Sequence, residues 1–154
     1  MANLVYNLAK KELLDGSLDL ANDVIQVMLV TSSYTPDADN DYVDESGAND
    51  PIDHELSGTG YAAGWAGAGR KTLAGKGFSE DDANDRGEFD DSADITWTAI
   101  DAGTAAAAIL IKKGSANDTD GLLIAYIDQG GFPVVTNGGD LTIQWNAEGI
   151  LQLS

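Results

Sequence analysis

The sequence predicts a mainly β protein: an antiparallel β-sandwich, or a barrel-like variant of one, with a short N-terminal helix. Short apolar runs rich in Val, Ile and Leu recur along the chain, and the segments SANDTDG, DQGGFP and TNGGD follow three of them. Short strands separated by turn residues are typical of antiparallel sandwiches and barrels. With 154 residues, of which 43% are hydrophobic, the chain is expected to form a single domain over residues 1–154.

The helix is predicted over residues 3–14. Leu4, Leu8 and Leu13 follow an imperfect helical spacing, charged residues lie between Ala9 and Leu13, and Gly16 provides the stop. No other segment carries a convincing helical spacing, so we expect this to be the only helix.

Strands are predicted in the apolar runs that follow. The run from Val24, VIQVMLVTSS, is too apolar and β-branched for a surface strand, so we expect it to be buried on both faces. In ADITWTAI, Ile95, Trp97 and Ala99 alternate with polar residues, which predicts a half-buried strand. The remaining predicted strands are AAAAILIKKG from Ala105, LLIAYIDQGG from Leu122, and a last strand LTIQWNAEGILQLS from Leu141, bent at Gly149.

The stretch ELSGTGYAAGWAGAG, from Glu55 to Gly69, has five glycines and no charge between Glu55 and Arg70. Read as a strand, it places Gly60, Gly64 and alanines on one face and Tyr61 and Trp65 on the other. Tight packing within a sheet is the favoured interpretation, and Gly64→Leu should then overpack that face. The alternative is that Gly60 and Gly64 contact another subunit.

The charge balance excludes several partners. Asp and Glu outnumber Lys and Arg by 26 to 8, giving a net charge of -18 that would repel a nucleic-acid backbone. No apolar run reaches the roughly 18 residues that span a bilayer, and the N-terminus lacks a signal-peptide pattern. We therefore expect no nucleic-acid or membrane partner and synthesis in the cytoplasm. The acidic segments at about 36–55 and 79–94 are expected to be exposed loops.

The sequence gives no catalytic, cofactor or metal pattern, so we predict that the protein is not an enzyme. His54 is the only histidine, and there is no cysteine. The segment RKTLAGKG at 70–77 lacks the first glycine and the Ser or Thr of a phosphate loop. The carboxylates of DADND at 37–41 alternate as in a calcium loop, but Tyr42 replaces the glycine and Ala48 the final Glu. A weak cation site there is a minor alternative.

Several motifs resemble a family of small tailed-phage virion proteins found among head and tail structural proteins. The most specific are SGTGY at 57–61, ITW at 95–97, LIAYID at 123–128 and IQWNAEGIL at 143–151, and the likeness covers nearly the whole chain. The resemblance implies a capsid cement or decoration protein on the virion exterior. It would bind the phage major capsid protein, stabilise the mature head by bridging capsid subunits, and form a homotrimer.

The expected capsid contact lies where the few positive charges gather. These are Lys10 and Lys11 on the helix, or Arg70, Lys71 and Lys76 in a basic loop beyond the glycine-rich strand. A second hypothesis is a tail, collar or fibre component that recognises a host surface glycan through exposed Trp or Tyr. The third, an acid-dependent hydrolase with paired carboxylates, is the weakest, because nothing in the sequence selects two of so many acids.

Overall fold

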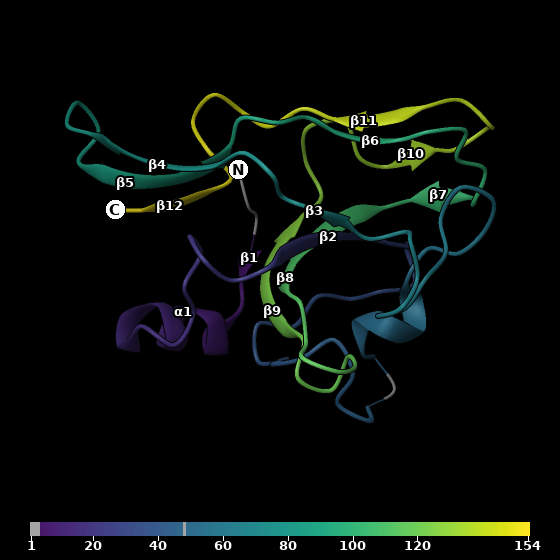
Figure 1. Cartoon of the computed structure of the whole chain (residues 1–154), viewed down its shortest axis with the longest axis horizontal. Helices are drawn as coiled ribbons and strands as arrows, with labels where there is room; N and C mark the ends of the chain where they lie inside the picture. The colour runs from purple at the N-terminus through teal and green to yellow at the C-terminus, as the bar shows by residue number, and fades with distance from the viewer. Residues whose placement is uncertain (1–3, 48) are drawn as a thin grey trace.

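The main layer of the structure is a five-stranded antiparallel sheet (Figure 1). The computed structural model describes residues 4–47 and 49–154. In spatial order the sheet contains β1 (Leu4–Val5), β9 (Leu122–Ile127), β8 (Ala107–Lys112), β2 (Ile25–Val30) and β3 (Lys71–Thr72). All residues of β2 and β9 are buried, as are all of β8 except the half-buried Lys112. The three buried strands predicted from the apolar runs are therefore confirmed.

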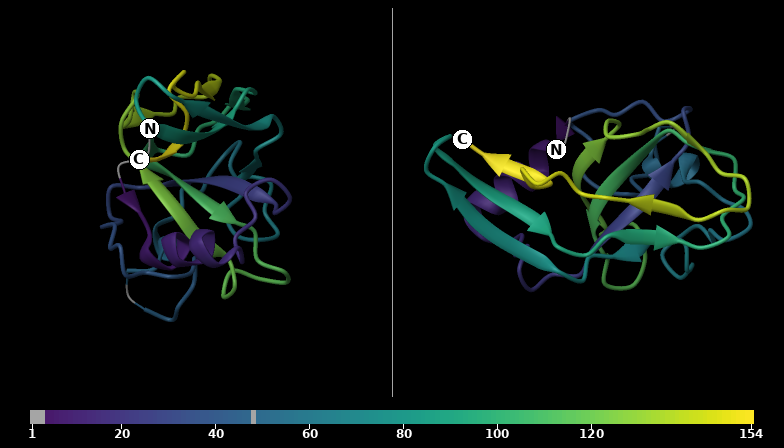
Figure 2. Two further views of the ribbon diagram at one scale, coloured as in Figure 1. Left: turned by 90° about the vertical axis from the view of Figure 1, so that its left-hand side faces the viewer. Right: turned by 90° about the horizontal axis from the view of Figure 1, so that it is seen from above.

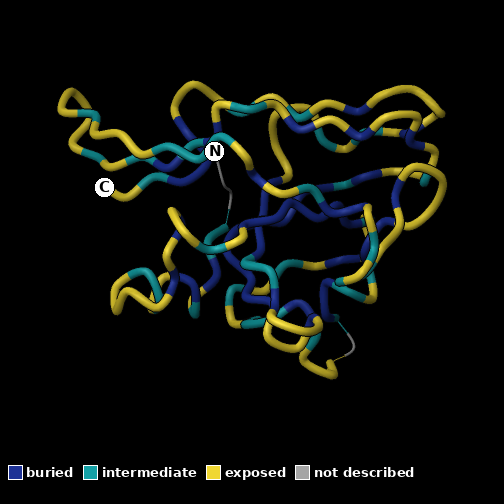
Figure 3. The backbone as a smooth tube through the Cα atoms, in the orientation of Figure 1, coloured by how far each residue is buried: buried dark blue, intermediate teal, exposed yellow. Residues whose placement is uncertain are grey.

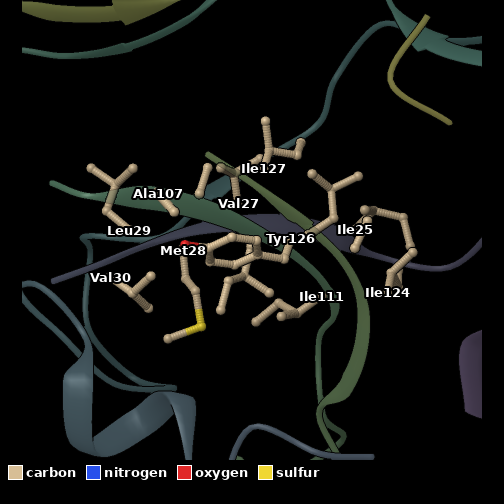
Figure 4. Close-up of a cluster of buried hydrophobic side chains, with 14 of the residues drawn as sticks. Ile25, Val27, Met28, Leu29, Val30, Ala107, Ile111, Ile124, Tyr126 and Ile127 are labelled. Carbon is tan, nitrogen blue, oxygen red and sulfur yellow. The ribbon is translucent and has the colours of Figure 1, made fainter. Parts of the chain in front are cut away.

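Both faces of this sheet are covered, because successive residues of β2 point to opposite sides. Figure 4 shows Val27 and Leu29 on one side of the sheet and Met28 and Val30 on the other, all with no exposed surface. A second layer of strands, described below, covers the side of Val27 and Leu29 (Figure 1). Helix α1 (Asn7–Asp15) and the segments around residues 31–55 cover the other side (Figures 1 and 2).

The other layer consists of one three-stranded and two two-stranded antiparallel sheets, most of whose strands run along the top of Figure 1. The first sheet has three strands. The second pairs the predicted half-buried strand, found at residues 95–97, with a later strand, and the third pairs two strands of two residues each. Together with the main sheet they confirm a mainly β, sandwich-like fold. The three sheets consist of β4 (Lys76–Asp81), β5 (Arg86–Asp91) and β12 (Leu151–Leu153); β6 (Ile95–Trp97) and β11 (Leu141–Ile143); and β7 (Thr104–Ala105) and β10 (Val134–Val135).

The short N-terminal helix is confirmed, but it begins later than residue 3. Leu4 and Val5 pair with Tyr126 and Ala125 of β9, so they are extended and α1 starts at Asn7. The helix ends at Gly16, which has the left-handed φ of 79° that glycine adopts without steric cost. Residue 3 lies outside the described residues.

The acidic segment at 79–94 is largely a β-hairpin, and the prediction of a loop there was wrong. Strands β4 and β5 pair from Lys76 opposite Asp91 to Asp81 opposite Arg86. Arg86 forms ion pairs with Asp81, Glu88 and Glu148, which offsets the repulsion between carboxylates that would otherwise oppose pairing. Viewed from above, β4, β5 and β12 extend beyond the central sheet at one end of the molecule (Figure 2).

The other acidic segment, at about 36–55, is mostly irregular and ends in the short 3₁₀ helix η1 (Pro51–His54). It is not wholly exposed, because Asp50 and Glu55 are buried. The Asp50 carboxylate accepts hydrogen bonds from the backbone N–H groups of Glu45 and Gly47. The segment is therefore held in place by its own buried acid.

The C-terminal segment forms two strands in different sheets, so the single bent strand predicted from Leu141 was wrong. Strand β11 pairs with β6, whereas β12 pairs with β5. Residues 92–94 separate β5, which ends at Asp91, from β6, which begins at Ile95. The C-terminal segment pairs with both strands, so it too is divided into two strands. The division lies at residues 144–150, where Gly149 has a φ of +83°.

The glycine-rich stretch is a series of tight turns, so the predicted strand with one bare face was wrong. Gly58 bridges to Tyr61, and the Gly67 N–H donates to the Gly64 carbonyl. Gly60 and Gly64 have φ values of +77° and +88°, which are incompatible with a regular strand. The glycines allow the positive φ values that these turns require. The alternation of small residues in the sequence does not correspond to the two faces of a strand.

The two glycines expected as a subunit contact differ in their surroundings, which makes them a matched pair for a test. A Cβ on Gly60 would lie 2.8 Å from the Ile100 Cα, whereas one on Gly64 would meet nothing within 4 Å. A side chain at Gly64 would therefore not overpack its surroundings, so the overpacking predicted from the sequence was wrong. Such a side chain is disfavoured because the backbone at Gly64 has a positive φ. We expect Gly64→Ala to cost about 1–2 kcal/mol and Gly60→Ala about 2–4 kcal/mol of unfolding free energy, measured in urea. Equal losses would contradict the close approach at Gly60.

Two buried tyrosines predict a loss of stability at alkaline pH. The Tyr6 and Tyr34 hydroxyls lie 2.8 Å apart, and burial raises the pKa of Tyr34 to about 12 and that of Tyr6 further. An unfolded tyrosine has a pKa of about 10, so the folded state holds these protons more tightly. The stabilisation is complete below pH 10 and is lost as pH rises through the folded-state pKa. Urea unfolding at pH 9 to 12 should show this decline, and Tyr6→Phe should weaken it. An unchanged free energy of unfolding would contradict it.

Candidate functional site

An open apolar groove of about 710 Å³ lies between the three-stranded sheet and helix α1. We call it the hairpin groove. One wall is the inner face of β4, β5 and β12, and the other is Leu13 of α1 with the loop through Leu18 and Leu20. Val5 of β1 also lines it. The groove therefore lies where the two layers of the fold are incompletely closed against each other.

The strand register explains the shape of the groove floor. Phe78, Phe89 and Leu151 occupy one cross-strand row, with the two phenyl centroids 5.3 Å apart. The next row toward the hairpin turn contains Gly87 and Leu153. A Cβ on Gly87 would meet nothing within 4 Å, so the floor has an open space beside the apolar row.

Large apolar side chains remain exposed at this groove. Phe78 is 58% and Leu153 69% exposed. Leu14, which does not line the groove, is 91% exposed on helix α1. Figure 3 shows the end of the hairpin and of β12 as mostly exposed or intermediate, in contrast to the buried central sheet. Contiguous exposed apolar surface that is bordered by polar residues is typical of an interaction site.

The charge around the groove is strongly negative. Residues 76–91 contain seven carboxylates against Lys76 and Arg86, a net charge of -5 (2 minus 7). A hydrogen bond from Asn84 lowers the pKa of Asp81, and one from Asn22 lowers the pKa of Asp19 at the other wall. These carboxylates therefore stay ionised well below neutral pH.

A second hollow, of about 480 Å³, lies between β11 and the loop that follows β9. We call it the Trp145 hollow. Its lining combines the rings of Trp145 and Phe132 with the amides of Gln129 and Gln144. The indole N–H of Trp145 is buried and has no hydrogen-bond partner among residues 4–47 and 49–154. Aromatic faces beside amide groups are suited to small polar ligands.

The structure does not gather the expected capsid contacts into one basic patch. Lys10 and Lys11 are exposed on α1, and Lys11 pairs with Asp15 at 2.8 Å. Lys71 lies half-buried on β3, and the Lys76 Nζ donates to the backbone carbonyl of Asp23 at 2.7 Å. Only the two helical lysines are therefore well exposed.

Arg70 is buried in the protein interior, so its expected role as an exposed docking residue was wrong. Its guanidinium donates to both oxygens of Glu55 and to both oxygens of Asp118, and its side chain is 1% exposed. Burial opposes the charge, but the bonds to the two carboxylates outweigh it and raise the pKa of Arg70. Tyr61 joins the same network by donating to Glu55 at 3.0 Å. The residue therefore holds three distant segments together.

The remaining titratable groups include His54 and the carboxylates of the segment 37–41. Within residues 4–47 and 49–154, no group of three or more His, Asp or Glu could hold a metal ion, and no helix is long and apolar enough to span a membrane. In the segment 37–41, Asp37 accepts a hydrogen bond from the Asp39 N–H, and Asp39 accepts one from the Asn7 amide. His54 is half-buried, with its ring 6.0 Å from that of Tyr34.

Comparisons with protein-family models, curated proteins and solved structures gave no match.

Proposed function

We propose that this chain is a tailed-phage capsid cement or decoration protein. It binds the outside of the mature head, on the virion exterior, and bridges neighbouring copies of the major capsid protein. The observation that carries the proposal is the hairpin groove, with Phe78 and Leu153 exposed on a protein of net charge -18. The motif resemblance described above supplies the virion context.

The docking surface combines the groove with the neighbouring helix. Leu14, Lys10 and Lys11 lie on the exposed side of α1, and Leu13 of the same helix lines the groove. This surface replaces the basic loop at 70–76, because Arg70 is buried and Lys76 is bound within the chain. Apolar contacts in the groove supply most of the binding energy, and the two lysines orient the protein.

Binding that bridges subunits stabilises only the assembled shell, by RT ln(1 + [L]/Kd). Purified protein should therefore co-sediment with undecorated shells and not with unassembled capsid subunits. We expect Phe78→Ser to reduce this co-sedimentation about tenfold, because it removes an exposed aromatic side chain from the groove.

Val135→Ser is the matched control. Val135 is 71% exposed on β10 and does not line the groove, so its replacement should leave co-sedimentation unchanged. No co-sedimentation of the wild-type protein, or equal loss in both variants, would contradict the proposal.

A homotrimer is part of the proposal, by analogy with the virion family. Sedimentation equilibrium of the free protein and subunit counting on decorated shells test it. Three copies at one site on the shell are expected, and single, separated copies would contradict the trimer. Gly60 and Gly64 are weak candidates for its contact, since their conformations already serve the chain's own turns.

The Trp145 hollow favours a second function, that of a tail, collar or fibre component that binds a host surface glycan. Sugar rings stack on aromatic faces and their hydroxyls bond to amides, both of which the hollow offers. Titration with hexoses and N-acetylhexosamines should then change the tryptophan fluorescence, and Trp145→Ala should abolish the change. A wild-type fluorescence that no sugar alters would exclude this function.

A further inference from the structure

Two sheet edges border the hairpin groove. Strand β12 is the last strand of the three-stranded sheet, and β1 is the last strand of the main sheet. Among the described residues, β12 pairs only with β5 and β1 only with β9. Edge strands present unpaired N–H and C=O groups that another extended chain can bind.

The outer strand β12 contributes to the wall of the groove. Leu151, Gln152 and Leu153 all line it, although their side chains alternate between the two faces of the sheet. Leu151 and Leu153 lie on the groove face of β12, the strand at the outer edge of the three-stranded sheet. Val5 of β1 lies in the same lining, so the groove runs between the two edges.

The negative charge around the hairpin groove indicates which kind of extended segment could bind there. The hairpin carries a net charge of -5, and Asp19 adds to it from the opposite wall. A second copy of this chain would bring its own acidic hairpin to the same place, and like charges at such an edge oppose pairing. A basic, partly apolar segment is complementary.

We propose that an extended segment of the capsid partner, with alternating apolar and basic residues, adds as a strand to the outer edge of β12, which has no strand partner among the described residues. This inference rests on the proposed function and specifies how docking occurs. Its backbone groups pair with those of Leu151–Leu153. Its apolar side chains pack beside Leu151 and Leu153 on the groove side of the sheet, and its basic side chains face the hairpin carboxylates. At about 3.3 Å per residue, β12 accommodates a core of roughly three to five residues.

The test uses two synthetic heptapeptides, one alternating Lys and Val and one alternating Glu and Val, with the full-length protein. The Lys–Val peptide should bind and slow amide hydrogen exchange in β12 about tenfold or more, because these amides gain partners. The Glu–Val peptide should not bind. Absence of Lys–Val binding up to millimolar concentration, or binding without protection of β12, would overturn the proposal.

Two glycine variants provide the matched controls. Gly87→Leu fills the open space on the groove floor, and Gly77→Leu adds the same side chain to the opposite face of the same sheet. Both sites have free space for a Cβ and neither has a positive φ, so both variants should fold. The leucine side chain introduced at Gly87 would crowd its cross-strand neighbour Leu153, beside which the peptide packs, so we expect Gly87→Leu to weaken peptide binding about tenfold. Gly77→Leu should leave binding unchanged. Equal effects, or a protein dimer formed through β12, would contradict the inference.

The outcome is separable from that of the proposed function. Co-sedimentation with shells while β12 amides still exchange freely in the complex would reject strand addition and retain capsid docking. Protection of β12 by the Lys–Val peptide without any binding to shells would retain strand addition and reject the capsid as its partner.

Discussion

Replacing Arg70 with methionine is expected to lower the free energy of unfolding by about 3–5 kcal/mol. Glu55 and Asp118 are 8% and 5% exposed, and Arg70 is their buried cationic partner. Methionine keeps much of the side-chain volume but leaves two carboxylates in the interior without a counter-charge. Urea unfolding at neutral pH, followed by circular dichroism, measures the loss.

Two controls separate the buried charge from a general effect of removing a cation. Lys11→Met breaks the exposed pair with Asp15 and should leave stability unchanged within error. Combining Arg70→Met with Glu55→Gln and Asp118→Asn should recover part of the lost stability, because the unpaired charges are then gone. A small loss in Arg70→Met alone would contradict the buried network.

Trp97→Ala is expected to cost about 3–5 kcal/mol of unfolding free energy, because it removes a large, fully buried side chain. Trp97 has no exposed surface, and its ring centroid lies 6.3 Å from that of Tyr61. Its indole N–H donates to the Gly69 carbonyl. Trp97 therefore connects β6 to two points of the glycine-rich turns, at Tyr61 and at Gly69, and its loss leaves a cavity and an unpaired carbonyl.

The half-buried Trp145 is the control for Trp97. Trp145→Ala should cost clearly less, because part of its ring already contacts solvent and its N–H has no partner among the described residues. Circular dichroism in urea is the appropriate measurement, since tryptophan fluorescence changes with either substitution. Equal losses of unfolding free energy in the two variants would contradict the larger contribution expected of the fully buried Trp97.

The central fold was predictable because its signal is local. The run from Ile25 to Val30 is so apolar and β-branched that burial on both faces is the simplest outcome, and Gly16 marks the helix end. The glycine-rich stretch misled for a physical reason. Glycine adopts positive φ without steric cost, so alternating small residues at Gly60 and Gly64 are equally compatible with a strand and with turns.

The candidate site was less predictable, because it depends on contacts between distant segments. Phe78, Leu13 and Leu153 are far apart in sequence, and only strand pairing and helix packing bring them to one groove. One feature of the sequence could have indicated the groove. Phe78 is a large apolar residue just before an acidic run, and such a residue is unusual in a solvated loop. Likewise, Arg70 lies 15 and 48 residues from its partners, and nothing local identifies them.

The temperature at which undecorated phage shells burst tests the central claim most directly, namely that the hairpin groove docks the protein on assembled capsid. Saturating wild-type protein should raise this temperature, Gly77→Leu should raise it equally, and Gly87→Leu should have little effect at the same concentration. A burst temperature that wild-type protein leaves unchanged, or that Gly87→Leu raises as much as wild type, would contradict the account.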